Sequence, residues 1–221
     1  MNIILFGPPG AGKGTQAKYL VKKIDGFQVS TGDMLRNEIN KNSEIGKKIT
    51  DHMRDGKFVS DEIVNKLIKN VISDLKNSKN LIFDGYPRSL SQAKHLDLLL
   101  NESSQNIDLI FFLNVDKETI IKRIEKRKSI EKRSDDELKT IIRRYDTYME
   151  TTKPVLDFYS KNPNFHEIDG ALEIDQITTK IESFIKVNVL NIQKSVYFTC
   201  NLINFLGSIN LMKIWIFRIE I

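Results

Sequence analysis

The sequence predicts an α/β fold in three layers, with helices on both faces of a five-stranded parallel sheet. Short apolar runs alternate with longer segments of helical periodicity, which is the pattern of repeated strand–helix units. Strands joined through helices run parallel, and parallel sheets are covered on both faces. The apolar runs are bounded by turn signals, and they predict strands over 2–6, 27–30, 80–84, 108–115 and 165–168.

The helical periodicity predicts six main helices. They are expected over 13–24, 61–75, 89–100, 117–127, 135–150 and 173–186. Two segments interrupt the strand–helix alternation: a helical insertion at 31–60 and a short, charge-dense stretch at 126–136. We expect both to be mobile flaps over a site.

Composition narrows the class of protein. A chain of 221 residues, 40% of them hydrophobic, can bury one sizeable core, which predicts one domain. Its net charge of +5, from 34 Lys and Arg against 29 Asp and Glu, is too small and dispersed to predict nucleic-acid binding. The single cysteine, Cys200, excludes an intramolecular disulfide framework and a cysteine-built zinc site. The apolar N-terminal run is too short for a signal peptide, so we expect a cytoplasmic protein.

The stretch 187–221 is an apolar C-terminal extension of a different character, rich in Ile, Leu, Asn and Phe. No charged residue lies between Lys194 and Lys213, which approaches the length of about 20 residues that a membrane span needs. Polar side chains interrupt the run, and each would be costly in hydrocarbon. A poorly ordered extension, a segment packed on the domain and a membrane contact all stay open, although we expect no membrane association.

A glycine-rich loop, GPPGAGKGT at 7–15, joins the first predicted strand to the first predicted helix. Glycines let successive backbone N–H groups and the helix N-terminus converge on an anion, and Lys13 adds a positive charge for the phosphates. The loop therefore predicts nucleotide binding. Gly14 occupies the position after the lysine where phosphate loops usually carry a hydroxyl, which comes one residue later at Thr15.

Four further motifs accompany this shifted loop: STGDMLR at 30–36, GKFVSD at 56–61, DGYPR at 84–88 and RSDD at 133–136. Together they resemble the adenylate kinases, a family of P-loop nucleoside monophosphate kinases, over about 1–186. The resemblance implies a P-loop NTPase-type fold with an AMP-binding flap at 30–59 and a lid at 126–136. The lid is of the short type and contains no cysteine, so no structural zinc is expected.

The resemblance also implies residues around both nucleotides. Those around ATP are Gly10, Ala11, Gly12, Lys13, Gly14, Thr15, Arg123, Arg127 and Leu172. Those around AMP are Thr31, Arg36, Lys57, Phe58, Val59, Gly85, Tyr86, Pro87, Arg88, Gln92, Arg133 and Arg144. The residues implied in catalysis are Lys13, Arg88, Arg123, Arg133 and Arg144.

The chemistry of several residues agrees with these roles. Arginine forks suit bidentate contacts to phosphate, and the Gln92 carboxamide has a donor and an acceptor to read adenine. Asp84 ends an apolar strand at the sheet edge where ligands bind, and we expect it to hold Mg²⁺ through water. Without the resemblance, Asp84 would be interpreted as a strand-end cap, Thr31 and Asp33 as a helix cap, and the arginines of 123–144 as a solvated face.

The resulting expectation is a monomeric, magnesium-dependent adenylate kinase that converts ATP and AMP to two ADP in adenine nucleotide homeostasis. Phosphoryl transfer depends on positioning and charge stabilisation, so no catalytic histidine is expected. Two alternatives stay open: a short-lid UMP/CMP kinase, which Thr31 and Gln92 disfavour, and a catalytically inactive nucleotide-binding module.

Overall fold

The computed structural model describes residues 1–74, 80–131 and 137–194. The chain divides into two compact units, Met1–Lys180 and Ile181–Ile221. The first holds a five-stranded parallel sheet in the order β2 (Phe27–Ser30), β3 (Leu81–Asp84), β1 (Asn2–Phe6), β4 (Leu109–Asn114) and β5 (Phe165–Asp169). The predicted α/β fold with its five parallel strands is therefore confirmed.

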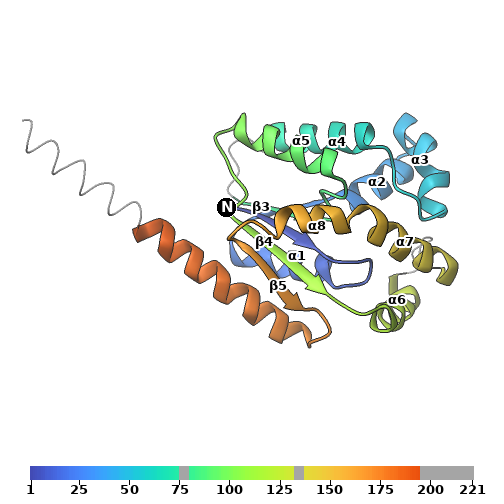
Figure 1. Ribbon diagram of the computed structural model, residues 1–221. Coiled ribbons are helices and arrows are strands. Elements are labelled where there is room, and N and C mark those ends of the chain that lie inside the picture. The colour runs from blue at the N-terminus through green and yellow to red at the C-terminus, as the bar shows by residue number, and fades with distance from the viewer. Residues whose placement is uncertain (75–79, 132–136, 195–221) are drawn as a thin grey trace, which may run out of the picture. The chain divides into compact units, whose positions relative to one another are not determined.

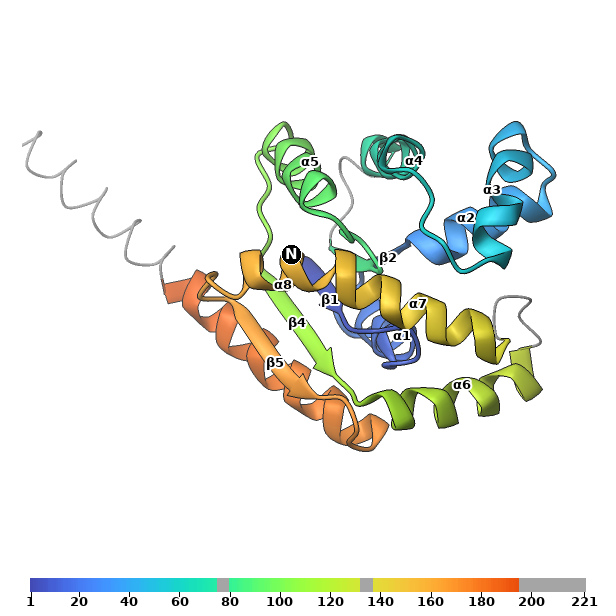
Figure 2. The same ribbon diagram turned by 45° about the vertical axis from the view of Figure 1, so that its right-hand side comes forward.

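Helices cover both faces of this sheet (Figures 1 and 2). One face carries α1 (Lys13–Lys23), and the other carries α4 (Asp61–Asp74), α5 (Leu90–Asn101) and α8 (Lys153–Tyr159). The central strand β1 is buried along its whole length, so its side chains serve both layers. Ile4 and Phe6 join a hydrophobic cluster with Leu96 of α5 and Val155 of α8. Burial on both faces explains why the strands appear in the sequence as continuous apolar runs.

Two pairs of helices project beyond the carboxyl ends of the strands (Figure 1). The first pair, α2 (Thr31–Asn40) and α3 (Glu44–Arg54), forms the helical part of the predicted flap. Ser30 caps α2 by accepting a hydrogen bond from the Asp33 backbone N–H at 3.3 Å, and Asp33 adds a negative charge in the first turn. The N-cap of α2 is therefore Ser30. The alternative interpretation from the sequence places the cap one residue later, at Thr31.

The second pair is α6 (Lys117–Glu131) and α7 (Leu138–Thr151). Helix α6 continues past the predicted end at 127, so the first six residues of the predicted lid, 126–131, are helical. The rest of the predicted lid, 132–136, lies outside the described residues. The last described helix covers 174–194, which extends eight residues beyond the predicted end at 186. The predicted boundary at 186 thus falls within a helix.

Strand register brings the functional loops to one edge of the sheet. Asp84, at the end of β3, pairs with Leu5 of β1 on one side and with Ser30 of β2 on the other. The phosphate loop follows β1, and the flap follows β2. Three segments that are distant in sequence therefore begin side by side at the carboxyl edge, where α/β sheets bind their ligands.

Candidate active site

Backbone carbonyl groups of the phosphate loop bind the side chain of its lysine. Lys13 Nζ donates hydrogen bonds to the carbonyl oxygens of Gly7 at 2.7 Å and Pro8 at 3.0 Å. Gly10 and Gly12 adopt φ angles of +84° and +95°, which side chains rarely adopt, and Gly12 caps α1 without a side-chain hydrogen bond. The N-terminus of α1 thus directly follows the loop and has no side-chain cap, which suits an anion-binding helix terminus.

Lys13 is buried in a strongly cationic neighbourhood. The pKa of Lys13 is lowered from 10.5 to about 8, mainly by burial and also by the charges of Arg88, Arg144 and Arg127, against the opposing charge of Asp84. Such a lysine gains an ionic partner when phosphate groups arrive, because their negative charge stabilises its protonated form. The same mutual repulsion indicates that these three arginines converge on the phosphate loop.

Asp84 lies against this loop. A Cβ atom added to Gly14 would lie 3.4 Å from Asp84 Oδ2, which is van der Waals contact, so the carboxylate lies directly beside the loop. The carboxylate also accepts a hydrogen bond from Gln28 Nε2 at 2.9 Å. Gln28 belongs to β2 and was not predicted as a site residue. The only sequence signal for it is a polar side chain within an apolar strand.

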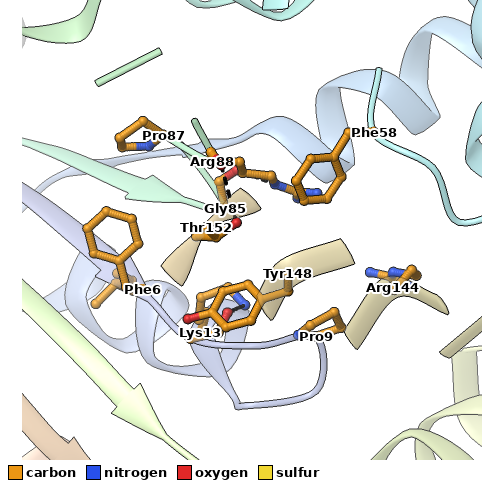
Figure 3. A pocket seen from close by; sticks show the side chains of 12 residues that line it. Phe6, Pro9, Lys13, Phe58, Gly85, Pro87, Arg88, Arg144, Tyr148 and Thr152 are labelled. Atoms are coloured by element: carbon orange, nitrogen blue, oxygen red, sulfur yellow. Dashed lines mark hydrogen bonds between the residues drawn. The ribbon is translucent and has the colours of Figure 1, made fainter. Parts of the chain in front are cut away.

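A second cationic group forms on the loop after β3. Arg88 Nε donates to the Gly85 carbonyl oxygen at 2.7 Å, and its guanidinium lies over the Phe58 ring, 5.0 Å from the ring centre. Figure 3 shows the side chains of Arg88, Arg144 and Lys13 lining a cavity together with Phe58. The loop from β3 and the helix α7 thus place cations opposite the phosphate loop.

Gly85 is essential to the shape of this loop. Its φ angle is +72°, and an added Cβ would lie 2.9 Å from Arg88 Nη2 and 3.3 Å from Thr31 Oγ1. Thr31 donates to the Gly85 carbonyl oxygen at 2.7 Å, which ties the start of α2 to this loop. The Tyr86–Pro87 peptide bond that follows is cis.

Gln92 lies beneath the same loop. Its side chain is buried, its Oε1 accepts from the Arg88 backbone N–H at 2.8 Å, and its Nε2 donates to Asp61 at 2.6 Å. The adjacent Tyr86 hydroxyl donates to Asn65 Oδ1 at 2.8 Å, and burial together with the negative charge of Asp61 raises the Tyr86 pKa. The predicted base-reading residue is thus linked to the backbone of the predicted phosphate-binding arginine.

Three predicted residues contact protein groups near them. Arg36 pairs with Asp33 one turn earlier in α2. Arg123 donates to the Gly170 carbonyl oxygen at 2.7 Å and reaches the carbonyls of 171–172, which positions the loop that contains Leu172. Lys57 is exposed and lies 3.4 Å from Asp55.

Most predicted site residues line one of two adjoining pockets. The larger is lined by the predicted ATP residues Gly10, Ala11, Gly12, Lys13, Gly14, Thr15, Arg123, Arg127 and Leu172, and by Arg36, Asp84, Gly85, Arg88 and Arg144. The smaller is lined by Lys13, Phe58, Gly85, Pro87, Arg88 and Arg144. Thr31, Lys57, Val59, Tyr86 and Gln92 are not among the lining residues of either, and Arg133 lies outside the described residues.

Tyr148 and Thr152 are among the lining residues of the smaller pocket that were not predicted. Thr152 is buried, and its hydroxyl donates a hydrogen bond to the Arg88 carbonyl oxygen at 3.3 Å, which restrains the backbone of the arginine. The hydroxyl of Tyr148 is buried and has no hydrogen-bond partner within 1–74, 80–131 and 137–194. Burial raises the pKa of this hydroxyl, so it stays protonated. Tyr148 follows Arg144 by one helical turn, but nothing in the sequence distinguishes it from an ordinary core tyrosine.

A phosphate loop that faces a second group of arginines at the edge of a parallel sheet defines a P-loop phosphotransferase. The model of the adenylate kinase family matches residues 5–164. An adenylate kinase of Pelagibacter ubique (strain HTCC1062) is 51% identical over 213 residues, which covers 85% of this chain and 100% of the relative. The adenylate kinase of Mycoplasma capricolum subsp. capricolum is 39% identical over 215 residues, which covers 85% of this chain and 100% of the relative. That of Hyphomonas neptunium is 41% identical over 186 residues, which covers 84% of this chain and 98% of the relative.

The chain belongs to the adenylate kinase family. The predictions of this family, of a nucleoside monophosphate kinase and of adenylate kinase function are confirmed. Within the described ranges, no helix is long and apolar enough to cross a membrane. The same part of the chain contains no group of three or more His, Cys, Asp or Glu side chains that could hold a metal ion.

Proposed function

We propose that the chain transfers the terminal phosphoryl group of magnesium-ATP reversibly to AMP through the residues described above. One observation carries the proposal: Lys13 from the phosphate loop, Arg88 from the loop after β3 and Arg144 from α7 line a single cavity. A protein that only binds a nucleotide has no use for cations on both sides of a phosphate. A phosphoryl transferase needs them, because charge spreads over the transferring group as it moves between its two partners.

Each side of the cavity then has a defined role. The backbone N–H groups of 10–15 and the Lys13 ammonium hold the donor phosphates. Arg36 and Arg88 orient the AMP phosphate as the attacking group, and their planar guanidinium groups suit bidentate contacts. Arg123, Arg127, Arg133 and Arg144 surround the transferring group. Catalysis comes from alignment and charge stabilisation, so the mechanism needs no protein base.

Asp84 fits a magnesium site that is built mainly from water. Its carboxylate lies beside the phosphate loop, and the described residues place no cluster of further metal ligands with it. Mg²⁺ keeps much of its hydration shell and needs only one or two carboxylates besides the substrate phosphates. When it is bound with ATP, magnesium would neutralise part of the phosphate charge. The Asp84 carboxylate would accept hydrogen bonds from its water ligands.

The acceptor is AMP, and the setting is a monomeric enzyme of the cytoplasm that contributes to nucleotide biosynthesis. Thr31 and Gln92 carry the preference for AMP over UMP and CMP. The single cysteine agrees with a reducing compartment. Closure of the flap at 30–59 and the lid at 126–136 would exclude water and limit ATP hydrolysis.

A coupled assay of ADP formation tests the proposal. Purified protein with magnesium and ATP should form ADP rapidly with AMP, and slowly with UMP, with CMP or without an acceptor. Faster transfer to UMP or CMP would overturn the acceptor assignment and leave the chemistry in place. No transfer to any acceptor would overturn the proposal as a whole.

A further inference from the structure

Both polar atoms of the buried Gln92 carboxamide are tied to groups of fixed character. Its Nε2 lies 2.6 Å from Asp61 Oδ1, and its Oε1 lies 2.8 Å from the Arg88 backbone nitrogen. A carboxylate can only accept a hydrogen bond, and a backbone N–H can only donate one. Of the two flip states of the carboxamide, only the present one satisfies both neighbours. In the other state the carboxamide oxygen would face the Asp61 oxygen and the carboxamide N–H would face the Arg88 N–H, so both hydrogen bonds would become repulsive contacts.

We propose that Asp61 is a positioning residue that fixes the flip state of the Gln92 carboxamide and thereby sets the preference for adenine over 6-oxopurine acceptors. This inference rests on the proposed function, in which Gln92 reads the base of AMP. Asp61 acts only through Gln92, and it need not touch the nucleotide.

The flip state matters because adenine and hypoxanthine present opposite patterns to the same carboxamide. Adenine offers an acceptor at N1 and a donor at its 6-amino group, whereas hypoxanthine offers a donor at N1 and an acceptor at O6. The second N–H of Gln92 and the second lone pair of its oxygen remain for the base. A fixed carboxamide matches adenine alone, whereas a carboxamide that flips freely also matches hypoxanthine. A site with unmatched buried polar groups rejects the wrong base.

The position of Asp61 supports this role over that of a simple helix-dipole charge. Asp61 begins α4, where an acidic residue stabilises a helix terminus. However, both of its carboxylate oxygens accept hydrogen bonds from the start of α5, Oδ2 from Ser89 Oγ at 2.6 Å and Oδ1 from Gln92. The carboxylate therefore bridges two helices.

The experiment compares kcat/KM for AMP with kcat/KM for IMP in the full chain and its variants. In Asp61→Ala this ratio should fall about three- to tenfold, the effect of about one net hydrogen bond. The change should come from a higher KM for AMP and a lower KM for IMP, with kcat for AMP largely retained. Asp61→Asn should keep the ratio, because its side-chain oxygen accepts from Gln92 and its amide donates to Ser89. Asp61→Ser, whose side chain is too short to reach Gln92, is the second test if Asp61→Ala fails to fold.

Ser89→Ala is the matched structural control. It removes the bond on the other carboxylate oxygen and also the cap of α5, since Ser89 Oγ accepts from the Gln92 backbone N–H at 3.1 Å. This variant should unfold at a lower temperature and keep the wild-type AMP-to-IMP ratio. A ratio that falls in Ser89→Ala as much as in Asp61→Ala would reduce the effect to general destabilisation and overturn the inference.

A double-mutant cycle separates action through Gln92 from action on the fold. Gln92→Ala should lower the ratio by itself, and adding Asp61→Ala to it should lower the ratio no further. An unchanged ratio in Asp61→Ala and Asp61→Ser, or a further full loss in the double variant, would overturn the inference. If the wild-type chain shows no AMP-dependent transfer, the proposed function fails. Wild-type transfer to AMP with a ratio insensitive to Asp61 overturns this inference alone.

Discussion

The carboxamide of Gln28 donates a hydrogen bond to Oδ2 of Asp84 at 2.9 Å, and the two residues lie on neighbouring strands of the sheet. The bond restrains a carboxylate that lies beside Gly14 of the phosphate loop. Restraint matters for the proposed magnesium site, because a single carboxylate would hold the water ligands of the ion in one place. An unrestrained Asp84 would have to lose side-chain freedom on every binding event.

Gln28→Ala should therefore raise the magnesium concentration needed for half-maximal activity about tenfold, which corresponds to the loss of one hydrogen bond to a charged group. A magnesium titration at fixed ATP measures this, and Mn²⁺ binding in the presence of ATP followed by electron paramagnetic resonance gives a readout independent of turnover. Asp84→Asn should have a larger effect in both measurements. Equal magnesium dependence in Gln28→Ala and the wild type would contradict the prediction.

The lowered pKa of Lys13 should make ATP binding depend on pH. Above pH 8 the buried ammonium of the ligand-free protein is increasingly neutral, so ATP must bring a proton with it. The affinity should fall by up to about tenfold per pH unit above pH 8. Calorimetry at pH 9 in two buffers of different ionisation enthalpy should detect uptake of close to one proton, and Lys13→Met should abolish it.

The effect of Lys13 on stability has the opposite sign. Between pH 8 and 10.5 the unfolded chain holds this proton more tightly than the folded chain, so the contribution of Lys13 to the unfolding free energy rises with pH. Lys47→Met, which changes an exposed lysine that pairs with Glu44, is the control and should leave both the proton uptake and this slope unchanged.

Gly85→Ala should damage the acceptor site through two separate effects. The left-handed φ of +72° costs about 1 kcal/mol for any other residue, and the new methyl would meet Arg88 at 2.9 Å. We expect a total loss of about 2–3 kcal/mol in the unfolding free energy, together with a higher KM for AMP. Denaturant unfolding of the ligand-free protein measures the first quantity.

Gly12→Ala is the matched control for backbone strain. Gly12 also has a positive φ of +95°, but nothing lies within 4 Å of an added Cβ. Its unfolding free energy should fall by only about 1 kcal/mol. Equal losses in the two variants would show that the contact with Arg88 contributes nothing.

Arg88→Lys should lower kcat/KM for AMP at least about a hundredfold while ATP binding changes little. Lysine keeps the charge but loses the planar fork, the Nε bond to Gly85 and the stacking over Phe58. Steady-state kinetics with AMP as the varied substrate gives the first value, and calorimetry with ATP the second. Arg54→Lys, at an exposed arginine paired with Asp51, should behave as the wild type. Near-normal AMP phosphorylation by Arg88→Lys would contradict the assigned role.

The sequence by itself determined the main strands and helices and the position of the phosphate loop. The strands are buried on both faces and the helices follow them, so each appears as a local pattern of apolar residues. The phosphate loop is contiguous, and its function depends on glycines and a lysine at fixed spacing, which the chain displays in order. Contiguity is the physical reason that these features could be predicted.

Only the tertiary structure decided which side chains form hydrogen bonds with the candidate site residues and hold them in position. The Gln28–Asp84 and Gln92–Asp61 bonds join residues separated by 56 and 31 positions, and Thr152 reaches Arg88 across 64. Each partner is an ordinary polar residue whose role depends on the register of β2 with β3, or on the packing of α4 and α8 around the loop after β3. Local pattern carries no information about such pairs, because their geometry exists only after the sheet has assembled.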